Sequence, residues 1–594
     1  MYTRSRLSLF KGIKPTSLYS PKKAFSNDMQ QQEPNIGSLY ESLLNQSLVN
    51  CNFISQVVDY WAQNPNQLAL RSIDQDNGEQ CDVSYQELAI GSHQIANFLT
   101  HKKVNKGDTI ALMLGQHVSW WYSLAGLMRQ GIAVVPCPRL LTAKDLIYRI
   151  NDLKINGMIT SPEQQEKINS IRDLCPSLKT TITYGINSVQ WDSLTDIFSY
   201  KVDIPKKPVI NTTINDPCVY LYTSGTTGQP KAVIHHHDYP FFHWPTGKRW
   251  LKSTPNDLVY NASDTGWGFT LWITTSVWAT GAKLLITPSN KKFNPQQMLK
   301  LLQEQPVTIF CAAPTVLRLL VAEKNFDNYS FPCLKRIVTV GEALDETVIQ
   351  RFESRGIEVA VGFGQAETPL LMGRVDSQPH VSATMGKPIS PYKVVILDEN
   401  HQSLPPGNIG QIAVDIDKGT RNGIMQGYAN APEKTKNAFT SDGRYYLTGD
   451  WAEYRTDGFF AYQGRKDDLI KDRGYRIGPD EVEKAGMSHP AVAKIAIVGI
   501  PRELGSKSLT IKGFILLKPG YLESPELIKD IQEHIKQETA PYKYPRQVEC
   551  LSVEEWSKYE TISGKIRRLA LREREIQNME QIKLQSQAQI SITM

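Results

Sequence analysis

The chain has 594 residues, several times the usual size of one domain, so it can bury more than one core and build a site between domains. Hydrophobic residues make up 41% and charged residues 21%, which is typical of folded proteins and excludes disordered, collagen-like and repeat compositions. Of 66 basic side chains, six lie in residues 1–27 beside no acidic one, so the remaining chain is balanced in charge. That balance offers no electrostatic reason to expect nucleic acid or an anionic membrane as a partner.

Residues 1–27 are rich in Arg, Lys and Ser and contain scattered apolar residues. This composition is typical of a mitochondrial transit peptide, and the alternative is a disordered basic tail. Lys11 and Lys14 interrupt the only apolar stretch that could serve as a secretory signal. We therefore expect the protein in the mitochondrial matrix.

The cysteines and the apolar runs indicate neither disulfides nor a membrane span. No CxxC pair occurs, and no apolar run approaches the length of about 18 residues that a transmembrane helix needs. We expect reduced, mostly structural thiols at Cys51, Cys81, Cys137, Cys175, Cys218, Cys311, Cys333 and Cys550.

Apolar residues at helical spacing predict helices over 53–62 and 85–99. Short apolar runs alternate with helix-like stretches further on, and they predict buried strands over 110–114, 131–136, 219–222, 283–286, 307–311 and 336–340. This alternation predicts an α/β protein with largely buried sheets.

The pattern changes near the end of the chain. Residues 492–499 and 511–517 read as strands, and amphipathic helices are expected over 525–537 and 567–582. A second, smaller α+β domain after about residue 465 is the simplest interpretation. Residues 576–594 form a polar tail of the kind that is commonly mobile.

The most informative motif is YTSGTTGQPK at residues 222–231, directly after an apolar run. Its hydroxyl side chains and glycines leave backbone N–H groups free to converge on an anion, and Lys231 adds a positive charge. The motif is not a Walker A loop, and a flexible polar turn is the alternative. We interpret it as a phosphate-binding loop.

Five further clusters suit a nucleotide. GEAL begins at Gly341, and GFGQAET at Gly362 sets an aromatic ring, an amide and a carboxylate among small residues, as an adenine slot beside a metal-binding acid would. Asp450 ends YLTGD and could accept two hydrogen bonds from ribose hydroxyls. A charged, turn-rich stretch covers 464–483, and SGKIRR exposes Lys565 in a glycine-flanked turn.

In this order the motifs resemble the adenylate-forming superfamily of acyl-CoA synthetases, adenylation domains and luciferases, from about residue 45 to 575. The blocks NFISQVVDYWA, WWYSLAGLMRQG, LTAKDLIYRI, SDTGW, GYRIGPDEVE and APYKYPR are most similar to the medium-chain acyl-CoA synthetases. The resemblance implies a large multi-sheet N-terminal domain over 45–464, followed by a small mobile α+β C-terminal domain over 465–575.

The resemblance also implies a reaction in two steps. A carboxylic acid attacks the α-phosphate of ATP and releases pyrophosphate, and a thiol then attacks the acyl-adenylate. Lys565 and Glu367 are the implied catalytic residues, with Lys565 between carboxylate and phosphate and Glu367 on Mg²⁺ together with Thr226. The implied ATP-binding residues are Thr223, Ser224, Gly225, Thr226, Thr227, Gly228, Lys231, Gly341, Glu342, Ala343, Gly362, Phe363, Gly364, Gln365, Ala366, Asp450, Arg465 and Lys565. An exposed surface lysine is the alternative for Lys565.

The small domain of such enzymes turns after adenylation to admit coenzyme A. Asp467 occupies the hinge position, and a solvated loop acid is its alternative. The implied coenzyme A contacts are Arg473, Gly474, Tyr475, Arg476, Lys543 and Arg546. The last two could equally belong to a solvated basic surface.

The acyl pocket is argued from size. Acetate-specific relatives carry a tryptophan at the position of Gly364, so a glycine here predicts room for a longer chain or an aromatic ring. Trp267 is expected to form a pocket wall, with a core aromatic as the alternative.

Several positions depart from the family pattern. Tyr559 and Glu560 replace Pro-Lys before the lysine turn, Ala366 replaces a threonine, and Lys507-Ser508 replaces Arg-Gly. The run His235, His236 and His237 invites a metal site, but adjacent side chains point in different directions from a strand, which favours a structural or pocket-lining role.

The sequence therefore predicts ATP-dependent activation of a medium-chain fatty or aromatic acid and its transfer to coenzyme A, with ATP, Mg²⁺ and coenzyme A as cofactors. Two alternatives stay open: an adenylate former that delivers to a carrier protein, and a non-catalytic nucleotide or acyl sensor. No nucleic acid and no transmembrane segment are expected.

Overall fold

The computed structural model describes residues 36–75, 78–184, 188, 190–198, 211–223, 230–288, 293–342, 344–376, 378–416, 421–465, 468, 470–472, 475–504, 509–539, 543–561 and 564–593. The described residues form two compact units. The first unit lies within 36–223, 231–393 and 416–437, and the second within 394–415 and 438–593. The predicted domain boundary at 464/465 falls inside the second unit and stays a prediction.

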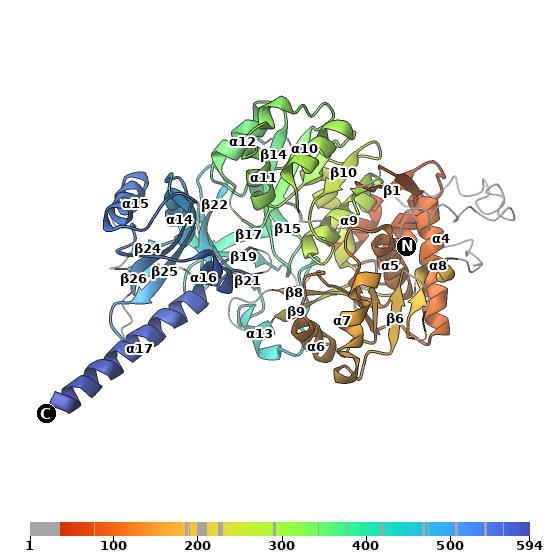
Figure 1. The fold of residues 1–594 in the computed structure, drawn as a ribbon. Coiled ribbons are helices and arrows are strands. Elements are labelled where there is room, and N and C mark those ends of the chain that lie inside the picture. Colours follow the sequence, from red (N-terminus) through yellow and green to blue (C-terminus); the bar gives the residue numbers. More distant parts are fainter. Residues whose placement is uncertain are drawn as a thin grey trace. The chain divides into compact units, whose positions relative to one another are not determined.

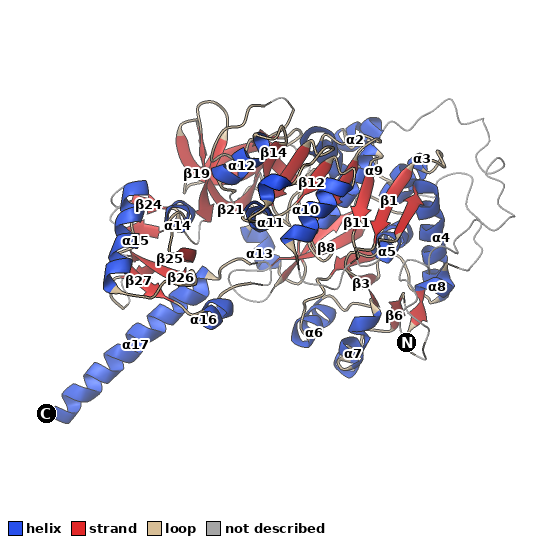
Figure 2. Ribbon diagram, turned by 45° about the horizontal axis from the view of Figure 1, so that its top comes forward, coloured by secondary structure: helices blue, strands red, loops and turns tan. Residues whose placement is uncertain are grey.

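The first unit contains a nine-stranded and an eight-stranded sheet (Figures 1 and 2). The nine-stranded sheet has the order β16 (Lys387–Pro388), β15 (Leu370–Gly373), β14 (Glu358–Gly364), β13 (Arg336–Val340), β12 (Ile309–Cys311), β10 (Leu258–Asn261), β11 (Lys283–Ile286), β1 (Leu68–Ile73) and β2 (Gln80–Ser84). The eight-stranded sheet has the order β20 (Gly427–Tyr428), β9 (Lys231–His236), β8 (Pro217–Thr223), β4 (Ala133–Pro136), β3 (Thr109–Met113), β5 (Gly157–Thr160), β6 (Thr180–Thr183) and β7 (Asp192–Ser193).

The helices of the first unit begin at recognisable caps. Ser84 and Glu87 form a reciprocal capping box at the start of α4, and Thr142 and Asp145 do so at α6, which satisfies amide groups that the helix leaves unpaired. The helices are α2 (Ile36–Leu44), α3 (Asp59–Trp61), α4 (Tyr85–His101), α5 (Val118–Gln130), α6 (Ala143–Asp152), α7 (Gln165–Asn169), α8 (Leu194–Ile197), α9 (Gly268–Thr280), α10 (Pro295–Glu304), α11 (Pro314–Val321), α12 (Glu346–Glu353) and α13 (Pro432–Asn437).

The parallel strands β10, β12, β13 and β14 are buried because helices cover them. Phe310 of β12 and Ile337 of β13 pack in one cluster with Leu299 of α10, Leu317 of α11 and Phe352 of α12. Figure 2 shows these helices beside the strands. A parallel sheet covered in this way needs continuous apolar runs, which explains why the short runs in the sequence predict it.

The second unit holds three sheets. They are formed by β18 (Ser403–Leu404), β17 (Lys393–Leu397), β19 (Asn408–Asp415), β21 (Tyr445–Tyr454) and β22 (Phe460–Arg465); by β23 (Ile470–Asp472) and β24 (Tyr475–Ile477); and by β25 (Val492–Pro501), β26 (Leu509–Leu517) and β27 (Gln547–Cys550). Its helices are α14 (Pro479–Met487), α15 (Pro525–Glu538), α16 (Val553–Lys558) and α17 (Arg568–Thr593).

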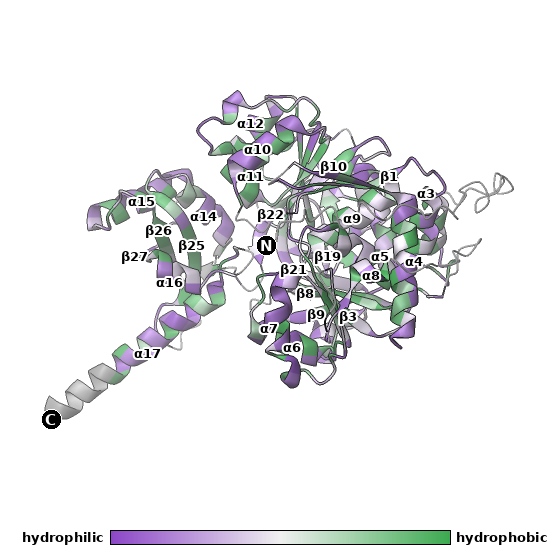
Figure 3. Cartoon of the chain, turned by 45° about the vertical axis from the view of Figure 1, so that its right-hand side comes forward, coloured by the Kyte–Doolittle hydropathy of each residue, from purple (hydrophilic) through white to green (hydrophobic). Residues whose placement is uncertain are grey.

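Hydrophobic residues run along β25 and β26 (Figure 3) and form cores on both faces of the small sheet. On one face Ile497 packs with Ile531 of α15, and on the other Phe514 packs with Trp556 of α16 and Leu571 of α17. Both sides of the sheet are therefore covered, as expected for a small α+β domain.

The structure confirms the α/β fold class and the predicted helices and strands. Several elements differ in extent; for example, the strand predicted over 307–311 is β12, Ile309–Cys311. The strand predicted over 131–136 begins at Ala133, because Gly131, with φ of 76°, ends α5 in the left-handed conformation. The last helix begins at Arg568 and continues to Thr593, so the described part of the polar tail has a helical backbone that extends beyond the small sheet (Figure 1).

The cysteines and the helices agree with the sequence. All eight cysteines are free thiols, and five of them are buried. Among the described residues, no helix is both long and apolar enough to cross a bilayer.

Candidate active site

In the first unit, the motifs predicted to bind adenine lie at the carboxyl ends of neighbouring parallel strands. Gly341 directly follows β13, whose Val340 is paired in register with Gly362 of β14. Gly341 has φ of 99°, and a Cβ atom there would have no heavy atom within 4 Å. This edge is where open α/β sheets bind ligands, and the glycine leaves backbone open to one.

Glu342, next in the same motif, is held by α11. Arg318 Nη1 lies 3.4 Å from Glu342 Oε2, and Arg318 Nε donates to Asp345 Oδ2 at 2.5 Å. Arg318 therefore holds Glu342 within the motif and Asp345 directly after it. Ala343, between them, lies outside the described residues.

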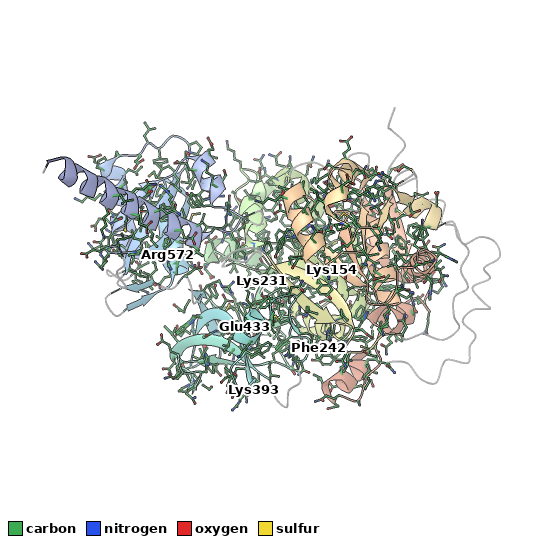
Figure 4. All side chains as sticks on the ribbon, turned by 90° about the horizontal axis from the view of Figure 1, so that it is seen from below. Lys154, Lys231, Phe242, Lys393, Glu433 and Arg572 are labelled. Atoms are coloured by element: carbon green, nitrogen blue, oxygen red, sulfur yellow. The ribbon has the colours of Figure 1, made fainter. Side chains whose placement is uncertain are left out.

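The predicted phosphate-binding loop lies in the sequence between β8 and β9. Thr223 and Lys231 face each other as register partners at the mouth of this antiparallel pair. The predicted residues Ser224, Gly225, Thr226, Thr227 and Gly228 lie outside the described residues. Lys231, labelled in Figure 4, has its Nζ 5.3 Å from the centre of the Tyr428 ring.

Tyr428 connects this lysine to the predicted metal ligand. Its hydroxyl donates to Glu367 Oε1 at 2.8 Å, while the Glu367 carbonyl accepts from the amide of Met425 at 2.8 Å. Sequence reasoning missed Tyr428, because the dipeptide Gly427-Tyr428 carries no signal of its own. Its pairing with β9 in the sheet brings it here.

A magnesium ion fits these residues. Among the described residues no group of three or more His, Cys, Asp or Glu could hold a metal ion. Magnesium does not need such a group, because it keeps water and phosphate ligands beside one or two carboxylates, and Glu367 supplies one.

The three consecutive histidines do not converge on one point. His235 Nε2 donates to the carbonyl of Ala366 at 2.7 Å, and its ring stacks on Tyr239. Burial lowers the pKa of His235 to about 3, so the imidazole is neutral. His236 Nδ1 lies 3.2 Å from the carbonyl of Ile214. His235 therefore tethers the segment of Ala366 to β9, as a structural residue would.

The space beside Gly364 is filled by an aromatic side chain. A Cβ atom at Gly364 would lie 2.6 Å from Trp272 Cη2 and 2.7 Å from the carbonyl oxygen of Pro369. Trp272 Nε1 donates to the Tyr239 hydroxyl at 2.7 Å, which fixes the indole. The glycine therefore accommodates Trp272, and the expected room for a longer chain depends on that side chain. Trp267 precedes α9 as its half-exposed N-terminal flanking residue.

The predicted ribose residues meet in the second unit. Asp450 of β21 and Arg465 of β22 are register partners, with Arg465 Nε 3.6 Å from Asp450 Oδ1. The Tyr462 hydroxyl donates to the same oxygen at 3.0 Å. A largely buried carboxylate with a fixed orientation results, and that geometry suits two vicinal hydroxyls.

Lys565 lies on a tight turn and is exposed. Its amide donates to Thr561 Oγ1 at 3.0 Å, and its carbonyl accepts from the Thr561 amide at 2.7 Å. The unusual Glu560 pairs with Lys494 of β25, with 2.6 Å between Oε1 and Nζ. The acidic side chain therefore has a cation of its own beside the turn.

Comparison with known proteins agrees with this arrangement. A family model described as AMP-binding enzyme matches residues 58–429, and one described as AMP-binding enzyme C-terminal domain matches residues 481–565. Acyl-coenzyme A synthetase ACSM3, mitochondrial, of Homo sapiens is 34% identical over 590 residues, which cover 96% of this chain and 98% of the relative. The chain belongs to the AMP-binding enzymes, among their acyl-coenzyme A synthetases.

Two further comparisons support this membership. Acyl-coenzyme A synthetase ACSM5, mitochondrial, of Mus musculus is 36% identical over 536 residues, covering 88% of this chain and 90% of the relative. The crystal structure of the anthranilate CoA ligase AuaEII with anthranoyl-AMP has a TM-score of 0.76 at 25% identity, covering 92% of this chain and 98% of that one. The fold is therefore that of a ligase crystallised with an acyl-adenylate.

The expected coenzyme A contacts of this acyl-coenzyme A synthetase are only partly described. Lys543 Nζ lies 2.5 Å from Glu481 Oε2, and Arg546 Nη1 donates to the carbonyl of Tyr544 at 3.0 Å. Tyr475 and Arg476 belong to strand β24. Asp467, Arg473 and Gly474 lie outside the described residues. The roles of these residues stay predictions.

Proposed function

We propose that the protein uses ATP to activate a medium-chain fatty or aromatic carboxylic acid as its acyl-adenylate and then transfers the acyl group to coenzyme A. The contact chain Lys231, Tyr428 and Glu367 carries the proposal. It places a cation and a carboxylate on either side of one tyrosine, next to the ends of the phosphate loop. A cation for phosphates and a carboxylate for their metal ion are the two groups that ATP binding requires.

The first step joins two anions, so positive charge must lie between them. A carboxylate is a poor electrophile until its oxygen is attached to a good leaving group, which the adenylate provides. Lys565 neutralises charge as it develops between the carboxylate and the α-phosphate. The turn that hydrogen-bonds through Thr561 presents the lysine without burying it.

Other residues bind the nucleotide. Glu367, together with Thr226, would hold Mg²⁺, which neutralises phosphate charge when bound. Asp450, oriented by Tyr462 and Arg465, accepts hydrogen bonds from the ribose hydroxyls. Gly341 and Phe363 are proposed to contact the adenine.

In the second step, the thiol of coenzyme A attacks the carbonyl carbon of the acyl-adenylate. We assign rotation of the small domain to the region of Asp467 and coenzyme A contacts to Arg473, Gly474, Tyr475, Arg476, Lys543 and Arg546. Release of AMP then completes the reaction.

The acid is proposed from the residues around Gly364. Trp272, Tyr239 and the ring of His243 form a connected aromatic group there, with His243 and Trp272 ring centres 5.7 Å apart. Aromatic walls favour apolar chains and flat rings over acetate, which offers too little surface to bury.

The matrix of mitochondria is the proposed location. Residues 1–27 have the composition of a transit peptide, and the names of the ACSM3 and ACSM5 relatives include the word mitochondrial.

The decisive test compares the protein with its Lys565→Ala variant. Pyrophosphate release is measured with ATP, Mg²⁺ and acids from acetate to dodecanoate and benzoate, with and without coenzyme A. We expect release that peaks at intermediate length or with benzoate and turns over only with coenzyme A. Lys565→Ala should lower the rate by about 100-fold or more while ATP still binds, because only the transition state loses its cation.

Lys558→Ala is the matched control, since Lys558 is an exposed lysine on α16 and should leave the rate unchanged. Acid-dependent release without use of coenzyme A would instead indicate a carrier protein as acceptor. ATP binding without any release would indicate a sensor.

A further inference from the structure

The guanidinium of Arg568 lies among three carboxylates in the second unit. Arg568 Nη2 and Nε donate to the two oxygens of Glu483 at 2.6 and 3.1 Å, so this pair is bidentate. Nη2 also contacts Asp480 Oδ1 at 3.1 Å, and Nη1 contacts Asp468 Oδ2 at 3.3 Å. The arginine side chain is only 17% exposed. A planar guanidinium with this many carboxylate partners fixes the orientation of their side chains as well as balancing their charge.

The cluster joins segments that carry proposed site residues. Arg568 is the first residue of α17 and follows Lys565 by three positions. Asp468, which it contacts, donates its amide to the carbonyl of Arg465 at 3.0 Å. Arg465 in turn pairs with Asp450. A continuous set of contacts therefore runs from the base of the lysine turn to the carboxylate proposed to hold the ribose.

The opposite charges of Arg568 and its carboxylate partners stabilise this set of contacts. Burial opposes the positive charge of Arg568, but Glu483 and Asp480 outweigh it and raise the pKa of the guanidinium. Burial also raises the pKa of both carboxyls, which Arg568 offsets in part. Removing the guanidinium would leave partly buried carboxylates without their cation, so the segments would have to rearrange.

We propose that Arg568 is a positioning residue for adenylation. Through its contact with Asp468, it fixes the position of the Lys565 turn relative to the Arg465–Asp450 pair. It touches no reacting atom. The proposal rests on the adenylating role of Lys565 and extends it to the residue that orients this lysine. Sequence separations of 85 to 100 residues within the cluster explain why no local motif predicts it.

The test separates the two half-reactions in Arg568→Gln. Acid-dependent exchange of pyrophosphate with ATP reports the first, and thioester formation from supplied acyl-adenylate and coenzyme A reports the second. We expect kcat of the first to fall at least tenfold, with KM for ATP and acid within twofold and the second half-reaction unchanged. Arg444→Gln, an equal loss of charge at an exposed arginine of the same unit that also pairs with a carboxylate, Asp415, should leave both rates unchanged.

Two results would overturn the proposal. The first is an unchanged rate of the first half-reaction in folded Arg568→Gln. The second is an equal fall in the rates of both half-reactions with a lower unfolding temperature, which is the result expected of a merely structural arginine. Should Arg568→Gln not fold, Asp468→Asn keeps the Glu483 pair and should still slow only the first half-reaction by threefold or more; an unchanged rate there contradicts the proposal. If Lys565→Ala itself adenylates normally, the proposed function fails and not this inference alone.

Discussion

Gly364 and Trp272 show how a single residue position depends on its partner. The glycine suggests an enlarged acyl pocket, but the structure places the indole of Trp272 where a larger side chain would lie. The indole is fixed by its hydrogen bond to Tyr239, so it occupies this space in a defined orientation. At the residue scale, we therefore expect Trp272 to limit the length of the proposed acyl pocket as much as Gly364 does.

We expect Trp272→Leu to shift the preferred acid toward longer chains. Each additional buried methylene contributes about 0.8 kcal/mol, or about fourfold in kcat/KM. The measurement is kcat/KM across straight-chain acids. Trp278→Leu on the same helix removes a fully buried indole of equal size and should leave the profile unchanged, although it lowers stability. A profile that moves equally in both variants would show that Trp272 does not line the pocket.

At the scale of elements, the lysine turn is held from two sides. Arg568 begins α17 after the turn, while Glu560 before it pairs with Lys494 of β25. Backbone bonds close the turn between Glu560 and Ile566. The resemblance predicts a lysine at position 560. Glu560 instead pairs with Lys494, which would repel a lysine at this position.

We expect Glu560→Lys to slow adenylation several-fold, because two ammonium groups would then face each other beside the turn. The effect on stability should be at most about 1 kcal/mol, since the pair is partly exposed. Adding Lys494→Glu should restore the rate by reversing the pair. The idea is wrong if the double variant is as slow as Glu560→Lys alone.

At the scale of the whole molecule, the first unit buries several neutral histidines. Burial lowers the pKa of His235 and His243 to about 3 and that of His93 and His237 to about 4. Both ring nitrogens of His243 lack a hydrogen-bond partner among the described residues. These imidazoles stay largely neutral in the native state near pH 5, but they bind protons once the chain unfolds.

The unfolding free energy should therefore fall as pH drops from about 6.5 toward 4, because the unfolded state binds more protons in that window. Each such histidine contributes a slope of up to about 1.4 kcal/mol per pH unit. Urea unfolding of the first unit at pH 5 to 7 measures it. His243→Phe should reduce the slope by about one proton, whereas His101→Gln, at an exposed position, should not. An identical slope in His243→Phe would contradict the prediction.

The sequence by itself determined the features that depend on neighbouring residues, namely the helices, the strands and their approximate bounds. Apolar periodicity and capping residues specify α4, and apolar runs specify the parallel strands, because these signals lie within a few residues of each other. The motifs that contain Lys231, Glu367, Asp450 and Lys565 were also recognisable in the sequence, because their order resembles that of the adenylate-forming enzymes. The roles of these four residues stay predictions.

Only the tertiary structure decided which side chains surround them. Tyr428 reaches Glu367 across 61 residues, and Arg568 reaches Asp468 across 100. Trp272 occupies the space of Gly364 because α9 and β14 lie together in the fold. Such contacts have no local sequence signature: their partners are brought together by the sheet order and by packing, which depend on the whole chain at once.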